Sequence, residues 1–319
     1  LMKVGPEGAG AKPGPAGYGM GGTEPTVSDA DLVLGYLNPD YFLGGRMELD
    51  RDAAVRAIEE KVAKPLKMSL IEAANGIYKI TNAQMADLIR RATVERGHDP
   101  RDFVLLAYGG SGPTHVGAYG RDLGSLLAVI SPYSSVFSAF GIASADILRT
   151  YVQSDPKLMP CAAAEVNAIF KASEERALRE FQGMGLDSDA VSLFRSAAMK
   201  FRRQVHELQV PVPGGELRDG DISEIQARFS DLYERTYGEG TSYEEAGVEV
   251  NTFRVTAIGH LPKPSPKPLP LKGPEAQGAL DGDRKVYFNA TQRFLDTPVY
   301  RAGRLEPGNE IQGPAIVED

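Results

Sequence analysis

Residues 103–113 read FVLLAYGGSGP, an apolar run that ends in a glycine-rich turn and a proline. The first five residues, Phe103 to Ala107, are continuously apolar, which is typical of a strand buried on both faces of an α/β sheet. The chain from Thr114 to Leu123 has helical character. A strand, a glycine turn and a helix in this order, with more helices and strands alternating around them, predict an α/β fold whose ligand-binding edge lies at the strand ends.

The turn, Gly109 to Pro113, has the residue types of a site for a phosphorylated ligand. Gly109, Gly110 and Gly112 lack a Cβ atom, so the backbone can adopt positive φ and a ligand can approach it closely. Pro113 suits the first turn of a helix, whose free N–H groups favour an anion or a polar ring edge. The spacing matches neither a Rossmann fingerprint nor a Walker loop. A turn with no ligand is the alternative, because glycine-rich turns commonly follow strands.

Capping signals define the elements before this stretch. Asp50 can cap a helix that runs to about Lys61, and Ser69 with Glu72 makes the capping box of a longer helix. Hydrophobic spacing predicts the elements that follow it. They are a buried strand at 126–130, helices at 136–148 and 162–183, a hairpin at 191–212, a helix at 222–237 and a strand at 248–258.

Composition changes along the chain predict its domains. Residues 1–22 hold eight glycines and three prolines, and six of the thirteen residues from Pro262 to Pro274 are proline, which indicates a stiff, extended connector. Both ends of the sequence read as cut from a longer chain. The expected parts are a Gly/Pro-rich segment with a short helix (1–48), an α/β region that holds the glycine turn (49–155), an α+β region (156–259) and a proline-rich connector with a small β-rich module (260–319).

The overall composition excludes several classes of protein. The 319 residues are 42% hydrophobic and 24% charged, which is ordinary for a globular protein. The net charge of -8 argues against binding to nucleic acid or to an acidic membrane. Cys161 is the only cysteine, so no disulfide framework is expected. No apolar stretch has the length of a membrane span, and the expected location is the cytoplasm.

Histidines and acidic residues give weaker signals. The four histidines have no metal-ligand spacing, so a metal site within the chain is not expected. His115 lies in the first turn after the glycines, where it is either satisfied by solvent or backbone or in contact with a ligand. Glu24, Asp29 and Asp31 could hold Mg²⁺, but a helix cap from Ser28 or Asp29 is the favoured interpretation.

Longer strings carry a resemblance to a known family. They are GGTEPTVSDADLVLGYLNPDYFLGG at 21–45, ERGHDPRDFVLLAYGGSGPTHVGAYGRDLG at 95–124, SSVFSAFGIASADILRTY at 134–151 and FNATQRFLDTPVYRAGRLEPGNEIQGPAIVED at 288–319. The chain resembles the C-terminal part of the proteins of the hydantoinase A family. That family includes ATP-dependent N-methylhydantoinases, 5-oxoprolinases and the nucleotide-binding subunits of acetone and acetophenone carboxylases. The string VFSAFG at 136–141 is closer to the ketone carboxylases.

The resemblance implies the second half of an actin-like ATPase fold, of the sugar kinase and heat-shock type, in which two α/β halves close over a nucleotide. Gly109, Gly110, Ser111 and Gly112 match the family's adenosine turn, and Pro113 and His115 follow it. The two phosphate loops of such folds are absent from this sequence. The implied contacts are therefore those to adenine and ribose, with ATP and Mg²⁺ held mainly by other segments.

The resemblance also implies a reaction. ATP phosphorylates a carbonyl or enolate oxygen, which makes it a good leaving group, and Mg²⁺ neutralises the transferred charge. The expected function is part of the ATP-binding subunit of a ketone carboxylase. Its expected partners are a hydantoinase B-like subunit, the N-terminal half of the same subunit and a small-molecule substrate. The alternatives are a subunit of an ATP-dependent cyclic amide hydrolase of the hydantoinase or 5-oxoprolinase type and a non-catalytic scaffold.

Overall fold

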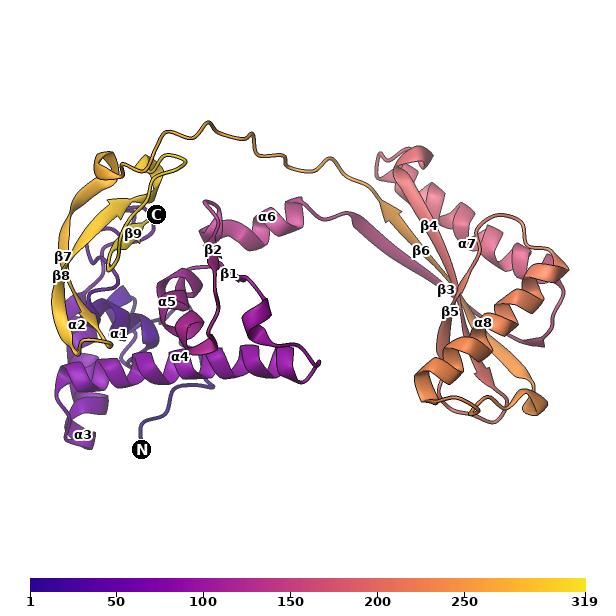
Figure 1. Cartoon of the computed structure of the whole chain (residues 1–319), viewed down its shortest axis with the longest axis horizontal. Helices are drawn as coiled ribbons and strands as arrows, with labels where there is room; N and C mark the ends of the chain where they lie inside the picture. The colour runs from indigo at the N-terminus through magenta and orange to yellow at the C-terminus, as the bar shows by residue number, and fades with distance from the viewer. The chain divides into compact units, whose positions relative to one another are not determined.

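The computed structural model describes residues 1–319, which form two compact units (Figure 1). Unit 1 comprises Leu1–Phe140 and Pro266–Asp319, and unit 2 comprises Gly141–Ser265. Each unit has a hydrophobic core of its own. No helix in the chain is both long enough and apolar enough to cross a membrane.

Three capped helices build the core of unit 1. They are α1 (Val27–Leu34), α2 (Arg51–Ile58) and α4 (Leu70–Val94), with a π-helical turn at Glu59–Ala63 and the short α3 (Lys64–Leu66) between the last two. Asp50 caps α2 through the amide of Ala53, and Ser69 and Glu72 form the capping box of α4, so both predicted caps are confirmed. The three helices pack through apolar side chains that include Leu34, Ile58 and Ala74.

The predicted strand–turn–helix is present, but its burial differs from the prediction. Strand β1 (Leu105–Ala107) pairs in parallel with β2 (Ala128–Ile130), and α5 (Ser111–Leu123) follows the glycine turn. Val104 is 57% exposed and Leu106 47%, and β2 is exposed throughout, so burial on both faces was a wrong expectation for these residues. The reason is that β1 and β2 form a sheet of two strands, and no other strand of the chain extends it.

The region after β2 also differs in part. Helix α6 covers only Phe137–Ala143, because the chain becomes extended at β3 (Ile147–Met159). Strand β3 pairs with β6 (Val248–Gly259) in unit 2. The expected boundary between residues 155 and 156 therefore falls inside β3, whose ladder with β6 holds it in one unit.

The C-terminal residues form the expected β module, and it belongs to unit 1. Strands β7 (Leu280–Phe288) and β8 (Arg293–Arg301) are antiparallel, and β9 (Ile316–Glu318) is parallel to β8. The proline-rich residues 262–274 have no helix or strand, as predicted. Compact unit 1 thus combines the two ends of the sequence, which the expected division kept in separate parts.

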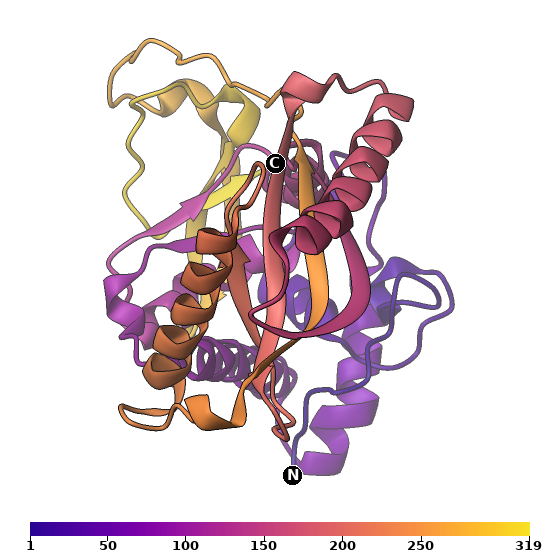
Figure 2. The same cartoon turned by 90° about the vertical axis from the view of Figure 1, so that its right-hand side faces the viewer.

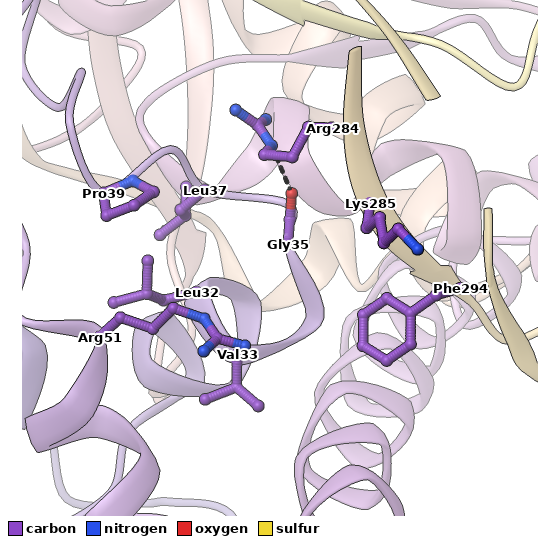
Figure 3. A pocket seen from close by; sticks show the side chains of 9 residues that line it. All are labelled: Leu32, Val33, Gly35, Leu37, Pro39, Arg51, Arg284, Lys285 and Phe294. Atoms are coloured by element: carbon purple, nitrogen blue, oxygen red, sulfur yellow. Dashed lines mark hydrogen bonds between the residues drawn. The ribbon is translucent and has the colours of Figure 1, made fainter. Parts of the chain in front are cut away.

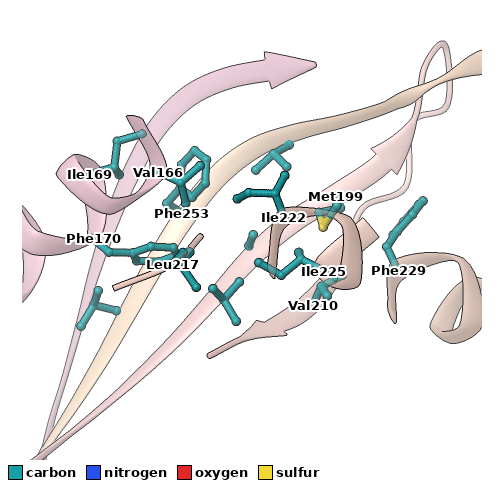
Figure 4. Packing of buried hydrophobic residues seen from close by; sticks show 14 of the residues in the cluster. Val166, Ile169, Phe170, Met199, Val210, Leu217, Ile222, Ile225, Phe229 and Phe253 are labelled. Atoms are coloured by element: carbon teal, nitrogen blue, oxygen red, sulfur yellow. The ribbon is translucent and has the colours of Figure 1, made fainter. Parts of the chain in front are cut away.

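Unit 2 is a four-stranded antiparallel sheet with two helices on one face. The strand order is β3-β6-β4-β5, with β4 at Val191–Phe201 and β5 at Leu208–Val212. Figure 2 shows α7 (Ala163–Gly183) and α8 (Asp219–Tyr237) across the same face of this sheet. Their apolar faces bury Phe170 and Phe229 against Phe253 and Met199 of the strands (Figure 4). The two helices, the hairpin and the last strand predicted for this region are confirmed.

Candidate functional site

The glycine turn between β1 and α5 is open. Gly109 has φ +77°, a conformation that favours glycine, and its amide donates to the carbonyl oxygen of Ser134 at 2.7 Å. A Cβ atom placed on Gly109 or Gly110 would meet no other atom within 4 Å. The space beside these two residues is therefore free, and a ligand could lie directly against the backbone.

The first turn of α5 presents donors to this open space. Gly110 is the N-cap, and no side chain caps the helix. The first amides of a helix lack an acceptor within the helix, and here they belong to Ser111 and Gly112, while Pro113 has no N–H. No acidic residue lies in this turn. The arrangement suits a ring nitrogen, a hydroxyl or an anion as the acceptor.

Aromatic rings that were not predicted as site residues lie beside the turn. The ring of Tyr108 lies 5.4 Å from that of Phe137, and the ring of Phe140 is stacked on that of Tyr133 at 5.3 Å. The hydrogen bond between Gly109 and Ser134 holds this aromatic segment against the turn. Tyr108 is 50% exposed, so part of its ring is free to contact a ligand.

The structure corrects both expectations for His115. The side chain is fully buried, and its Nε2 lies 3.2 Å from Oδ2 of Asp31 on α1. Its ring stacks on that of Tyr78 from α4 at 5.0 Å. Solvent does not satisfy it, and it does not face the open space beside the glycines. Of the six candidate residues, Gly109 to Pro113 form one continuous surface, whereas His115 lies behind it.

The acidic residues near the N-terminus are engaged inside the protein. The carboxylate of Asp29 accepts hydrogen bonds from the amides of Ala16 (3.2 Å), Gly17 (2.7 Å) and Thr26 (2.8 Å), and also from the Thr26 hydroxyl. The N-cap of α1 is Thr26, with Asp29 completing its capping box, so the expected cap residue is off by two or three positions. Glu24 pairs with Lys61 at 2.8 Å.

Asp31 also lies in the interior. Burial raises the pKa of Asp31, and its contact with His115 opposes that rise. Because Asp29 and Asp31 face inward, they do not fit a magnesium site. No group of three His, Cys, Asp or Glu side chains anywhere in residues 1–319 is placed to hold a metal ion.

A separate hollow of about 390 Å³ lies among α1, α2 and the β7–β8 hairpin (Figure 3). Its floor includes Leu32 and Leu37, and Arg284 crosses it to donate from Nε to the carbonyl oxygen of Gly35 at 2.9 Å. None of its lining residues belongs to the glycine turn. The hollow marks the joint between the C-terminal module and the end of α1.

Comparisons with known proteins cover the whole chain. The profile described as Hydantoinase/oxoprolinase matches residues 1–151, and the profile described as Hydantoinase/oxoprolinase C-terminal domain matches residues 153–319. The chain is 37% identical over 326 residues to the acetophenone carboxylase gamma subunit of Aromatoleum aromaticum, covering 99% of this chain and 44% of that protein. It is 35% identical over 327 residues to the caprolactamase subunit alpha of Pseudomonas jessenii, covering 100% and 46%.

A solved structure agrees with these matches. The nucleotide-free structure of acetone carboxylase superimposes with a TM-score of 0.89 at 32% identity, covering 100% of this chain and 46% of that one. The chain thus spans slightly less than half the length of each of these three relatives. On the two profiles, which together span nearly every residue, the chain belongs to the hydantoinase/oxoprolinase family.

Proposed function

We propose that this chain is part of the ATP-binding subunit of an ATP-dependent ketone carboxylase, in which Gly109 to Pro113 contact the adenosine. The observation that supports this most is the open glycine turn between a strand and an uncapped helix. The similarity to the acetophenone carboxylase gamma subunit adds to it. The fold would be the second half of an actin-like ATPase domain.

The residues around the turn fit an adenosine. The amides of Ser111 and Gly112 can donate to a ring nitrogen or a ribose hydroxyl, and the absence of Cβ atoms on the glycines lets the base approach the backbone. Tyr108 and Phe137 offer aromatic faces next to the turn, and stacking on such rings favours any purine. The site is thus suited to hold and orient the nucleoside.

The phosphates and the metal need other groups. When bound, ATP supplies the phosphoryl group that turns a carbonyl or enolate oxygen into a leaving group. In this chain Asp29 and Asp31 are committed to internal contacts, and no other acidic cluster lies at the turn. We therefore assign phosphate and Mg²⁺ binding to segments outside these residues, and derive no step for this chain through the metal.

The exposed sheet supports a role within a larger assembly. Leu106, Val129 and Ile130 of β1 and β2 are each at least 40% exposed, and Leu126 and Leu127 beside them are more than half exposed. Val129 and Ile130 are neighbours in β2 and point to opposite faces, so both faces of this small sheet expose apolar side chains, as at an interaction site. We propose that the N-terminal half of the same subunit covers it, and that a hydantoinase B-like subunit carries out the carboxylation.

Two other functions have support. The caprolactamase subunit alpha is similar at 35% identity over the whole chain, which favours hydrolysis of a cyclic amide almost as strongly as carboxylation of a ketone. Both reactions need activation of the carbonyl group, for attack of water on the carbonyl carbon in the amide and for formation of the enolate in the ketone. A scaffold role without productive nucleotide binding fits the engagement of His115 and both aspartates inside unit 1.

The test is a substrate screen on the assembled complex. ATP consumption is measured with ketones plus bicarbonate, with cyclic amides and with neither, and the carbon products are identified. Turnover that depends on a ketone and bicarbonate is the expected result. Turnover with cyclic amides alone would replace the carboxylase by an amide hydrolase. If neither ketones nor cyclic amides stimulate ATP consumption, both enzymes are ruled out and the scaffold remains.

A further inference from the structure

The position of the glycine turn depends on what holds α5. Gly109 and Gly110 contact little themselves, and the turn has one backbone bond to Ser134. Helix α5 begins directly at Gly110, so any shift of the helix moves the turn. The one buried polar side chain on α5 is His115, one turn into the helix.

A column of aromatic rings leads from His115 to the C-terminal β module. The imidazole stacks on Tyr78 of α4 at 5.0 Å with 28° between the planes. Tyr78 stacks on Tyr36 at 4.9 Å with 6° between the planes. The Tyr36 hydroxyl donates to the carbonyl oxygen of Tyr287 on β7 at 2.9 Å, and Phe288 meets the Tyr36 ring edge-on. Helices α5 and α4, the residue after the α1 C-cap and strand β7 are thus in one continuous line of contacts.

The outer end of the column is anchored. Arg284 of β7 donates from Nε to the carbonyl oxygen of Gly35 at 2.9 Å and from Nη2 to that of Tyr36 at 3.2 Å, and its Nη1 binds Glu318. Gly35 has φ +87°, and a Cβ atom there would overlap the carbonyl oxygen of Lys285. Strand β7 therefore lies in backbone contact with the residue next to Tyr36.

The inner end is anchored as well. Asp31 is 3% exposed, and the one polar partner of its Oδ2 is His115 Nε2. Moving His115 away would leave a buried carboxylate oxygen without a partner, which is costly. Sliding of α5 is thus opposed by the Asp31 contact on one side of the imidazole and by the Tyr78 ring on its face.

We infer that the C-terminal β module positions the glycine turn through this column, so that Tyr36, Tyr78 and His115 are positioning residues for the nucleotide site. None of the three contacts the nucleotide. The part of this inference that concerns nucleotide rests on the proposed function, whereas the mechanical link between β7 and α5 does not. If these three residues only packed the core, replacing them would loosen all of unit 1 evenly.

The mechanical link is tested by hydrogen exchange in the 319-residue chain. Tyr36→Phe removes the hydroxyl that bonds to β7 and contacts the Tyr78 hydroxyl, and Tyr78→Leu removes the ring between Tyr36 and His115. Each is expected to speed exchange of amides 109–118 by roughly two- to tenfold, the effect of losing one buried contact of this kind. Tyr78→Phe keeps the stacked ring and loses only the hydroxyl contacts with Tyr36 and Asn82, so its exchange should stay closer to wild type than that of Tyr78→Leu. Tyr18→Phe is the matched control, because Tyr18 packs against the same core through Phe42 and lies outside the column.

Two outcomes of the exchange experiment would overturn the link. One is unchanged exchange at 109–118 in both Tyr36→Phe and Tyr78→Leu. The other is a uniform rise over α4 and α5 together with a lower melting temperature, since this is the signature of general packing.

The nucleotide part is tested in the complete assembled protein by titration with ATP. The same two variants should raise the Kd for ATP by a factor similar to the change in exchange, with KM rising more than kcat falls. Faster exchange with unchanged ATP affinity would overturn the positioning of the site. A wild-type assembly that binds no ATP, with exchange at 109–118 still responding to Tyr36→Phe, would reject the proposed function and leave the mechanical link standing.

Discussion

Replacing Gly35 by alanine tests how closely strand β7 lies against the end of α1. Gly35 is the left-handed C-cap of α1, with φ +87°, and a Cβ atom there would overlap the carbonyl oxygen of Lys285 and lie 3.3 Å from its carbonyl carbon. The alanine can be accommodated only if β7 withdraws or the cap changes conformation. Either change disturbs the bonds that Arg284 and Tyr36 make across this joint.

The expected loss follows from these contacts. Holding an alanine in the left-handed region costs about 1–2 kcal/mol. Weakening two hydrogen bonds from a charged donor and one from a hydroxyl adds about 2–3 kcal/mol, because part of each bond is regained from water. The free energy of unfolding of unit 1 should therefore fall by about 3–5 kcal/mol.

The assay is hydrogen exchange in increasing urea, read separately for the two units. Amides of α4 report unit 1, and amides of β4 and β6 report unit 2, which should not change. Gly303→Ala in the same module is the matched control, because a Cβ atom at Gly303 would meet nothing within 4 Å. A loss of no more than about 2 kcal/mol in unit 1 would refute the tight joint, since the strained φ alone accounts for that much.

Three further changes test other parts of the structure. Asp29→Asn puts an NH₂ group against buried backbone donors, so unit 1 should lose about 2–4 kcal/mol in urea unfolding and residues 14–18 should exchange faster. Gly259→Ala would place a Cβ atom 2.6 Å from Cδ1 of Phe181, so overpacking should cost unit 2 about 1–3 kcal/mol in the same assay. The side chain of Lys263, with the Leu261 amide, lowers the pKa of Asp146 to about 2. The ionised Asp146 therefore stabilises unit 2 fully above pH 3.8, and this stabilisation is lost as the pH falls toward 2. Lys263→Ala should raise the pKa of Asp146 toward its usual value in an NMR titration.

The first two of these changes each have a control in the same unit. Asp52→Asn alters an exposed acid in the first turn of α2 and should change stability by less than about 0.5 kcal/mol. Gly183→Ala lies at the end of α7 with open space around it and should leave unit 2 unharmed. An Asp29→Asn or Gly259→Ala variant as stable as its control would contradict the packing described. An Asp146 pKa that stays unchanged in Lys263→Ala would contradict the ion pair between Asp146 and Lys263.

Local features of the fold could be predicted from the sequence. The caps at Asp50 and Ser69 depend on residues three positions away, so their signal lies within a short window. The turn at Gly109 and Gly110 is likewise set by neighbouring residues. Burial of β1 was mispredicted because burial depends on what covers a strand, and the apolar pattern of Phe103 to Ala107 carries no information about which residues supply that cover.

The environment of His115 was missed although part of its signal was in the sequence. His115, Val116, Tyr119 and Leu123 form the buried face of α5 at helical spacing, so the period alone places the histidine inside. Its partner Asp31 lies 84 residues away, and the bond from Tyr36 to Tyr287 joins residues 251 apart. Pairs at such separations leave no local pattern, and only the folded chain brings them together.

Isothermal titration of ATP into the complete assembled protein tests the central claim most directly, with Gly110→Val and Gly117→Val as the two variants. Both glycines have open space where a side chain would go, so neither change should disturb the fold, and only Gly110 lies at the turn. We expect wild type and Gly117→Val to bind ATP alike, whereas Gly110→Val should bind at least about tenfold more weakly, as for loss of one base contact. Equal binding by all three proteins, or no binding by any, would contradict the assignment of the turn to adenosine.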